Sequence, residues 1–191
     1  MIKTKEDLAY YKQQDAIANG YSGHLKWNSL RGHFNKTKRF LTLLRETEYY
    51  KNNPSPINKL FYLYKSYRLN QVAFSMGYSI PVNVFGPGLS LPHYGTIVVN
   101  GATKVGAFCR LHCCTNIGAS GGNKEAPSIG DNVYIGPGAI LFGNIKMASN
   151  ITIGANATVN QSFEEEHIAI AGKPAKIVKR DMPNWIEFNK L

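Results

Sequence analysis

The sequence predicts a mainly β protein with an α-helical N-terminus, whose β part is a parallel β-helix of six-residue repeats. Three observations predict it. Aliphatic residues recur at every sixth position from Val99 to Val159 except at position 123, glycine often follows them, and a small residue often lies two positions before them. A helix repeats its buried face every 3.6 residues and a strand every two, so a period of six fits neither alone. It fits a coil in which each step is a short strand and a turn, with three steps per triangular layer.

The repeat assigns a place to each residue of a step. The aliphatic side chain is expected to point into the coil, the small residue to fill the narrow interior beside it, and glycine to turn the corner, where a Cβ would strain the backbone. The aliphatic positions are Val99, Val105, Leu111, Ile117, Ile129, Ile135, Leu141, Met147, Ile153 and Val159, and the small ones include Thr103, Cys109, Thr115, Ala139 and Ala157.

Three helices are predicted before the coil. The first runs from its N-cap Thr4 to about Asn19, where Gly20 ends it. The second runs from Asn35 to about Asn52. Ser55 caps a third helix that starts at Pro56, because proline suits the first turn of a helix.

The helical part carries most of the formal net charge of +10. Its basic residues are expected to form a solvated helix surface, with attraction to an anionic partner as the alternative. No nucleic-acid recognition motif accompanies them, so nucleic acid is not expected as a partner. The basic residues are Lys36, Lys38, Arg39, Arg45, Lys51, Lys59, Lys65 and Arg68.

An apolar and aromatic stripe follows one face of the third helix, at Ile57, Leu60, Phe61, Tyr64 and Tyr67. Such a stripe is typical of core or of a subunit interface. Because basic residues lie between the aromatic ones, peripheral attachment to a membrane surface is an alternative.

Neither a membrane span nor a metal site is expected. No run of 18 or more apolar residues exists, and the N-terminus lacks the apolar core of a signal peptide, which predicts a cytoplasmic location. The cysteines Cys109, Cys113 and Cys114 have no second cluster with which to complete a zinc site, so we expect them to be reduced and structural.

Three regions are predicted: a helical domain over residues 1–80, the coil domain over 81–180, and a tail or short capping helix over 181–191. Within them, a bridge over 77–88 leads to a coil that begins near Leu89. The polar stretch from Ala119 to Ser128 lacks the aliphatic residue of the repeat and is expected to project as a loop. A short helix from Met182 onward is expected to cover the open end of the coil.

Several motifs carry a resemblance to a known superfamily. The hexapeptide run, the loop after Ile117 and the ending Ala-Gly-Lys-Pro-Ala at 171–175 resemble the left-handed β-helix, or hexapeptide-repeat, acyltransferases. The segment Gly-Leu-Ser-Leu-Pro-His-Tyr-Gly-Thr-Ile-Val-Val at 88–99 is similar to the catalytic-histidine segment of serine acetyltransferases and of their relatives in capsular polysaccharide clusters. The resemblance covers roughly residues 86–178. It implies a left-handed coil and a homotrimer, with a dimer of trimers as a further option, and acetyl-coenzyme A bound in clefts between neighbouring coils.

The resemblance makes His93 the catalytic base. Attack of a hydroxyl on a thioester needs a base that removes the proton as the bond forms, and imidazole titrates near neutral pH. Backbone N–H groups near Gly118 or Gly136 are candidates for stabilising the oxyanion. His112, one layer beyond Tyr94, is either an acceptor-site residue or inert wall. His24, His33 and His167 have no motif around them and are expected at the surface.

Two departures from the serine acetyltransferase pattern bear on the acceptor. Pro92 stands where that family carries an aspartate before the histidine, and the loop over 119–128 lacks the family's second histidine. Glu125 is the candidate acid to replace the orienting aspartate. These departures favour acetylation of a sugar hydroxyl in polysaccharide biosynthesis. Serine O-acetylation in cysteine biosynthesis is the alternative, and a non-catalytic scaffold is the alternative of another class.

The resemblance also indicates where acetyl-coenzyme A would bind, as the acyl donor. Its pantetheine arm is expected to pass small residues in the second half of the coil, and two lysines are expected to meet its phosphates. The small residues are Gly118, Ala119, Gly138, Ala139 and Ala157, and the lysines are Lys173 and Lys176.

Overall fold

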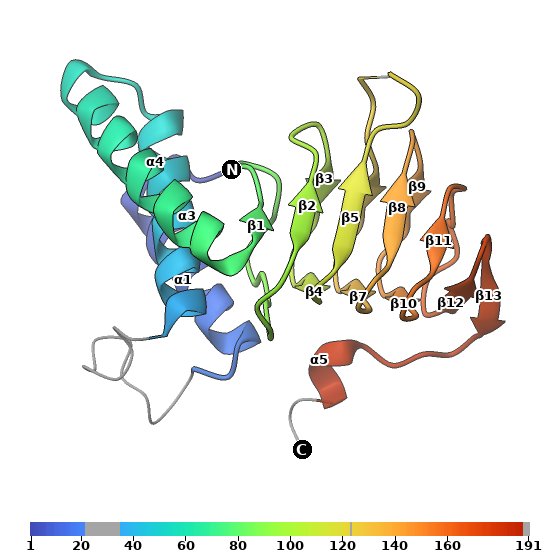
Figure 1. Ribbon diagram of the computed structural model, residues 1–191. Helices are drawn as coiled ribbons and strands as arrows, with labels where there is room; N and C mark the ends of the chain where they lie inside the picture. The colour runs from blue at the N-terminus through green and yellow to red at the C-terminus, as the bar shows by residue number, and fades with distance from the viewer. Residues whose placement is uncertain (22–34, 123, 189–191) are drawn as a thin grey trace.

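The computed structural model describes residues 1–21, 35–122 and 124–188. A cluster of helices is followed by a coil of short strands, and the chain then turns back along the coil (Figure 1). His24 and His33 lie outside the described residues. Both the helical N-terminus and the β-helix that the sequence predicts are present.

The predicted helices form with the predicted caps. α1 spans Lys5–Ala18 behind Thr4, α3 spans Lys36–Asn52 behind Asn35, and α4 spans Pro56–Met76 behind Ser55. In each, the capping side chain accepts a hydrogen bond from a backbone N–H of the first turn, a group that has no partner inside the helix. The sequence therefore determines the helix starts locally.

The coil consists of three sheets that share one axis, and every strand pair but one is parallel. The strand orders are β1-β2-β5-β8-β11, β3-β6-β9 and β4-β7-β10-β12-β13. The strands are β1 Tyr78–Ser79, β2 Ile97–Val99, β3 Lys104–Val105, β4 Arg110–Leu111, β5 Thr115–Gly118, β6 Ser128–Ile129, β7 Tyr134–Ile135, β8 Ile140–Phe142, β9 Lys146–Met147, β10 Thr152–Ile153, β11 Thr158–Val159, β12 Ala169–Gly172 and β13 Ala175–Lys179.

The interior of the coil follows the six-residue repeat. All ten aliphatic positions are buried, and so are the small residues beside them. Successive layers place these side chains in register, as where Leu111 pairs with Ile135 and Ile135 with Ile153. Burial also raises the pKa of the Cys109 thiol to about 12, so this cysteine stays protonated as a small core side chain. The predicted core is confirmed.

The coil begins earlier than the predicted start at Leu89. β1 already pairs with β2 at Tyr78 and Ile97, and Phe85 forms a bridge to Val105. This first turn of the coil does not show the six-residue repeat because one of its ends packs against the helices. Its side chains therefore have to fit that contact as well as the interior of the coil. Coil structure therefore starts immediately after Gly77, the left-handed C-cap of α4.

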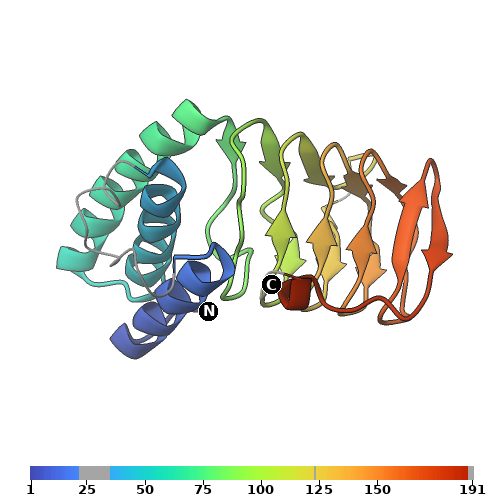
Figure 2. The same cartoon turned by 90° about the horizontal axis from the view of Figure 1, so that it is seen from below.

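Beyond β5 and β13 the chain leaves the repeat. The described residues of the 119–128 stretch project from the coil as a loop, as predicted (Figure 1). The tail, however, does not cover the open end. It returns toward the first layers, where α5, Trp185–Phe188, is held by a 2.8 Å hydrogen bond from the Trp185 indole to the Phe108 carbonyl (Figure 2). The antiparallel strand β13 lies at the far end in its place.

A buried ion cluster joins the helices to the coil. Arg45 of α3 is fully buried and pairs with Asp15 of α1 at 2.8 Å and with Glu48 at 3.0 Å. Its guanidinium also donates to the carbonyls of Phe85 and Gly86. The prediction of a solvated Arg45 is therefore wrong, because α1 supplies a carboxylate from 30 residues away.

The outer face of α4 is apolar and exposed. Phe74 is 90% exposed, and no acidic residue occurs in the helix. None of the described helices has the length and apolarity needed to cross a membrane. The exposed apolar residues of this face are Ile57, Leu60, Phe61, Leu63, Tyr64, Tyr67 and Phe74.

Replacing Arg45 by Met should lower the free energy of unfolding by about 3–5 kcal/mol, because two carboxylates would stay buried without their cation. Urea denaturation measures this. Arg180→Met, which removes an exposed pair with Glu165, serves as the control and should cost less than about 1 kcal/mol. Equal effects of the two substitutions would contradict the role of the cluster.

Candidate active site

The segment before His93 is held from both sides. Its Ser90 forms a parallel bridge with Arg110 of the coil. From α1, Asp15 accepts hydrogen bonds from the N–H groups of Gly88 and Leu89, each at 2.9 Å. The side chain of Asn19, just beyond α1, accepts from the Leu91 N–H at 3.0 Å and donates to the Leu89 carbonyl at 2.8 Å. These contacts determine where the chain enters the turn that carries His93.

His93 presents an exposed imidazole at this turn. Its backbone carbonyl accepts a 2.7 Å hydrogen bond from the Tyr78 hydroxyl, which anchors the residue while leaving the ring accessible. The ring centroid lies 5.8 Å from that of His112, and His112 in turn lies 5.0 Å from Tyr134. The structure thus brings the two predicted histidines together in adjacent layers.

His112 is held in its neutral form. Burial and the neighbouring charge of Arg110, with a contribution from His93, lower its pKa to about 4. Its Nε2 accepts a long hydrogen bond, 3.5 Å, from Arg110 Nε, which requires that this nitrogen carry no proton. His112 is therefore a hydrogen-bonding group and not a second cation in the site.

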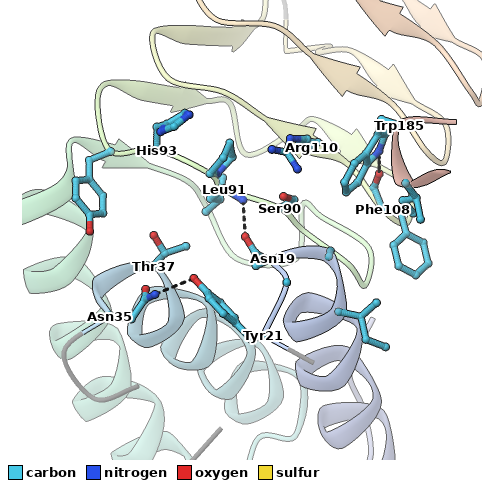
Figure 3. Close-up of a pocket in the computed structure, with 16 residues that line it drawn as sticks. Asn19, Tyr21, Asn35, Thr37, Ser90, Leu91, His93, Phe108, Arg110 and Trp185 are labelled. Atoms are coloured by element: carbon cyan, nitrogen blue, oxygen red, sulfur yellow. Dashed lines mark hydrogen bonds between the residues drawn. The ribbon is translucent and has the colours of Figure 1, made fainter. Parts of the chain in front are cut away.

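A pocket of about 850 Å³ opens between the helices and the first layers of the coil. His93, Ser90 and Arg110 contribute the coil side of it, and α5 contributes Trp185 (Figure 3). The opposite side comes from the helices, and the residues labelled there are Asn19, Tyr21, Asn35 and Thr37. A concave site with a few converging polar groups is the usual form of a small-molecule site.

Arg110 and Trp185 were not predicted as site residues. The guanidinium of Arg110 lies 5.3 Å from the centroid of the Trp185 ring, although 75 positions separate the two in sequence. Arg110 occupies an ordinary outward position of a repeat, and Trp185 lies beyond the last repeat. The signal in the sequence that could have indicated this part of the site is Arg110 itself, an arginine at an outward position two residues before His112.

Glu125 lies away from His93 within one chain. β2 and β5 run parallel, and His93 precedes the start of β2 while Glu125 follows the end of β5. The carboxylate of Glu125 accepts a 2.6 Å hydrogen bond from Asn144. Among the described residues no carboxylate is hydrogen-bonded to the His93 ring, so that part of the chain does not supply the expected orienting acid.

The residues expected to contact the donor are divided between two edges of one sheet. Gly118 is the last residue of β5 and Ala119 follows it, whereas Gly138 precedes the start of β8, which runs parallel to β5. Ala139 and Ala157 are fully buried, so their side chains belong to the core of the coil. A single chain does not bring the whole expected set together.

The predicted oxyanion donor near Gly136 and the two predicted phosphate-binding lysines lie in different surroundings. The Gly136 N–H donates to the Ile153 carbonyl at 2.9 Å within the coil, so it is not free to bind an oxyanion. Lys173 and Lys176 are exposed near the β12–β13 turn. Within the described ranges, no three His, Cys, Asp or Glu side chains gather as a metal site would require.

Comparison with known proteins finds serine acetyltransferases as relatives of this chain. The chain is 37% identical to serine acetyltransferase from Staphylococcus aureus over 98 residues, which cover 50% of this chain and 46% of that protein, and 35% identical to the Staphylococcus epidermidis enzyme over the same length. The crystal structure of Neisseria gonorrhoeae serine acetyltransferase matches 92% of this chain and 68% of its own, with a TM-score of 0.70 and 25% identity. The chain is thus similar to the serine acetyltransferase-like branch of the hexapeptide-repeat acyltransferases, in sequence over half of its length and in fold over most of it.

The structural match to serine acetyltransferase confirms that the coil is a left-handed β-helix. The chain spans about half the length of the curated serine acetyltransferases it matches. No model of a protein family matches it. The similarity therefore establishes the fold, while the acceptor depends on the residues around His93.

The pKa of His112 can be measured by NMR titration of its ring proton and should be about 4. Because the ordinary value is about 6.5, the unfolded state binds more protons between these values, and His112 should lower the stability of the fold as pH falls through this window. Arg110→Met should raise the midpoint of the His112 titration by removing a repelling charge, while Arg180→Met should leave this midpoint unchanged. A wild-type midpoint near 6.5 would contradict the assignment.

Proposed function

We propose that the protein is an acetyl-coenzyme A-dependent O-acetyltransferase with His93 as the catalytic base. The observation that carries the proposal is the accessible His93 imidazole at the edge of a pocket, on a segment that α1 and the coil both hold in place. Similarity to serine acetyltransferases supports the reaction class, and the resemblance of the 88–99 segment supports acetyl-coenzyme A as donor.

Serine is the better supported acceptor. Pro92 and the lack of a histidine in the 119–128 loop favour a sugar hydroxyl as acceptor. The relatives from both Staphylococcus species, however, are named serine acetyltransferases, and neither supports a role in polysaccharide biosynthesis. One observation retains a sugar acceptor as a second candidate: Pro92 replaces the expected aspartate, and the residues described around His93 offer no carboxylate in its place.

The proposed reaction is a general-base acyl transfer. The His93 imidazole removes the proton of the acceptor hydroxyl as the oxygen attacks the thioester carbonyl, which forms a tetrahedral intermediate. Collapse of the intermediate breaks the carbon–sulfur bond. The imidazolium then returns its proton to the departing thiolate, so that the products are the acetyl ester and coenzyme A.

The coil offers a track for the donor on the corner that carries the histidines. Leu111, Ile135, Ile153 and Ile170 are partners in successive layers, so the corner after Ile170 lies three layers beyond His112. Strands in a sheet are about 4.8 Å apart, which makes this distance about 14 Å. A pantetheine arm extended along this corner would place its phosphates near Lys173.

Replacing His93 by Ala should lower kcat by about 10²- to 10⁴-fold, because the hydroxyl would lose its base. Release of coenzyme A in the presence of L-serine or a sugar acceptor measures this. The shift of the melting temperature by acetyl-coenzyme A should remain, since His93 is not needed to bind the donor. His167→Asn, outside the pocket, is the control and should keep full activity. Equal turnover by His93→Ala and wild type would overturn the proposal.

We further propose that the active unit is a homotrimer. Gly118 and Glu125 lie at the end of the β2–β5 pair opposite to His93, and a neighbouring coil would bring such a loop corner to the histidine corner. Sedimentation should therefore give about three times the chain mass of 21.2 kDa. Mixed assemblies of His93→Ala and Ala119→Trp chains should regain activity that neither homogeneous variant has. An active monomer would contradict this arrangement.

A further inference from the structure

The pocket next to His93 holds one permanently charged side chain. Among the described residues that line it there is no Asp, Glu or Lys, and Arg110 is the single arginine. Its other polar side chains are uncharged at neutral pH or, for His93, act as the proposed base. The uncharged ones are Asn19, Tyr21, Asn35, Thr37, Ser90, Tyr94 and Trp185.

Arg110 is half-buried without a counter-charge. Its contacts are the neutral His112 ring, at 3.5 Å, and the face of Trp185. The other arginines with ion pairs differ in this respect, since Arg45 meets two carboxylates and Arg180 meets Glu165. No carboxylate lies within 4 Å of Arg110 in the described part of the chain. A cation partly removed from water in this way gains free energy by binding an anion.

The surroundings of Arg110 also direct it toward the reacting groups. His112 contacts Arg110 on one side and the His93 ring on the other, so the three side chains form a continuous row. Figure 3 shows Arg110 on the same wall of the pocket as His93, with Trp185 beyond it. An anionic group bound at Arg110 would therefore hold the rest of the same molecule beside the proposed base.

We propose that Arg110 is an anion subsite that binds the carboxylate of the acetyl acceptor. The inference rests on the proposed function and names the substrate class: a hydroxyl compound that also carries a carboxylate. L-Serine, small hydroxy acids and acidic sugars share this chemistry. The described pocket residues offer no carboxylate to an ammonium group, so the amine of serine is not required for binding.

The test compares matched acceptors at saturating acetyl-coenzyme A. L-Serine carries both charges, L-glycerate keeps the carboxylate and the configuration without the ammonium, and L-serinamide keeps the ammonium without the carboxylate. Glucuronate and glucose form the corresponding sugar pair. We expect kcat/KM to follow the carboxylate, with L-glycerate above L-serinamide and glucuronate above glucose. The acidic acceptor with the higher kcat/KM, either the serine analogue or the sugar acid, identifies the source of the carboxylate.

Variants of Arg110 then test the residue itself. Arg110→Met should raise KM for the carboxylate acceptors about 10- to 100-fold, because a hydrogen-bonded charge pair is lost, while KM for their neutral analogues and for acetyl-coenzyme A stays unchanged. Arg110→Lys retains the charge and should recover part of the affinity. Arg180→Met, an exposed arginine outside the pocket, should behave as wild type. Circular dichroism checks that the variants are folded.

The outcomes separate this inference from the proposed function. Acetyl transfer with equal kcat/KM for the acidic and neutral members, or an equal rise of KM for both in Arg110→Met, would overturn the anion subsite and leave the acetyltransferase intact. If no acceptor is acetylated, the proposed function fails, and calorimetric titration with L-glycerate and glucuronate decides the subsite. Binding that is lost in Arg110→Met supports it, and equal binding to wild type and Arg110→Met overturns it.

Discussion

The buried pairing of Arg45 with Asp15 and Glu48 is the interaction on which the rest of the structure depends. A guanidinium without access to water is stable only if its charge and its N–H groups are all satisfied, and here α1, α3 and the first turn of the coil each supply acceptors. Asp15 also accepts from Gly88 and Leu89. One cluster therefore fixes the orientation of the helices and the start of the coil together.

The position of the candidate active site depends on the same ion cluster. Four residues beyond Leu89 the chain reaches His93, so the same contacts that close the helix–coil junction determine where the imidazole lies. The coil supplies the second support, since its layers place His112 beside His93 in a fixed register. A side chain held by two rigid supports needs little ordering when a substrate binds, which agrees with the role of general base proposed for His93.

The electrostatics of the pocket bear on the acceptor. Serine acetyltransferases are the relatives that sequence and structure comparison identify, yet Pro92 and the lack of carboxylates among the described lining residues distinguish this site from the pattern of that family. A neutral His112 beside a half-buried Arg110 leaves one positive charge in the pocket. Similarity to serine acetyltransferases and a pocket without carboxylates are compatible if the site recognises the acceptor by the acceptor's own carboxylate.

The sequence by itself determined the helix caps, the coil and its interior, because these depend on local capping chemistry and on a strict period of six, as at Thr4, Ser55 and Leu111. The residues that flank His93 in the sequence also made it the candidate catalytic base. Only the tertiary structure decided the burial of Arg45, the return of Trp185 to the pocket and the separation of Glu125 from His93. These contacts join residues far apart in sequence, and no local pattern records which distant side chain will supply a charge or a ring.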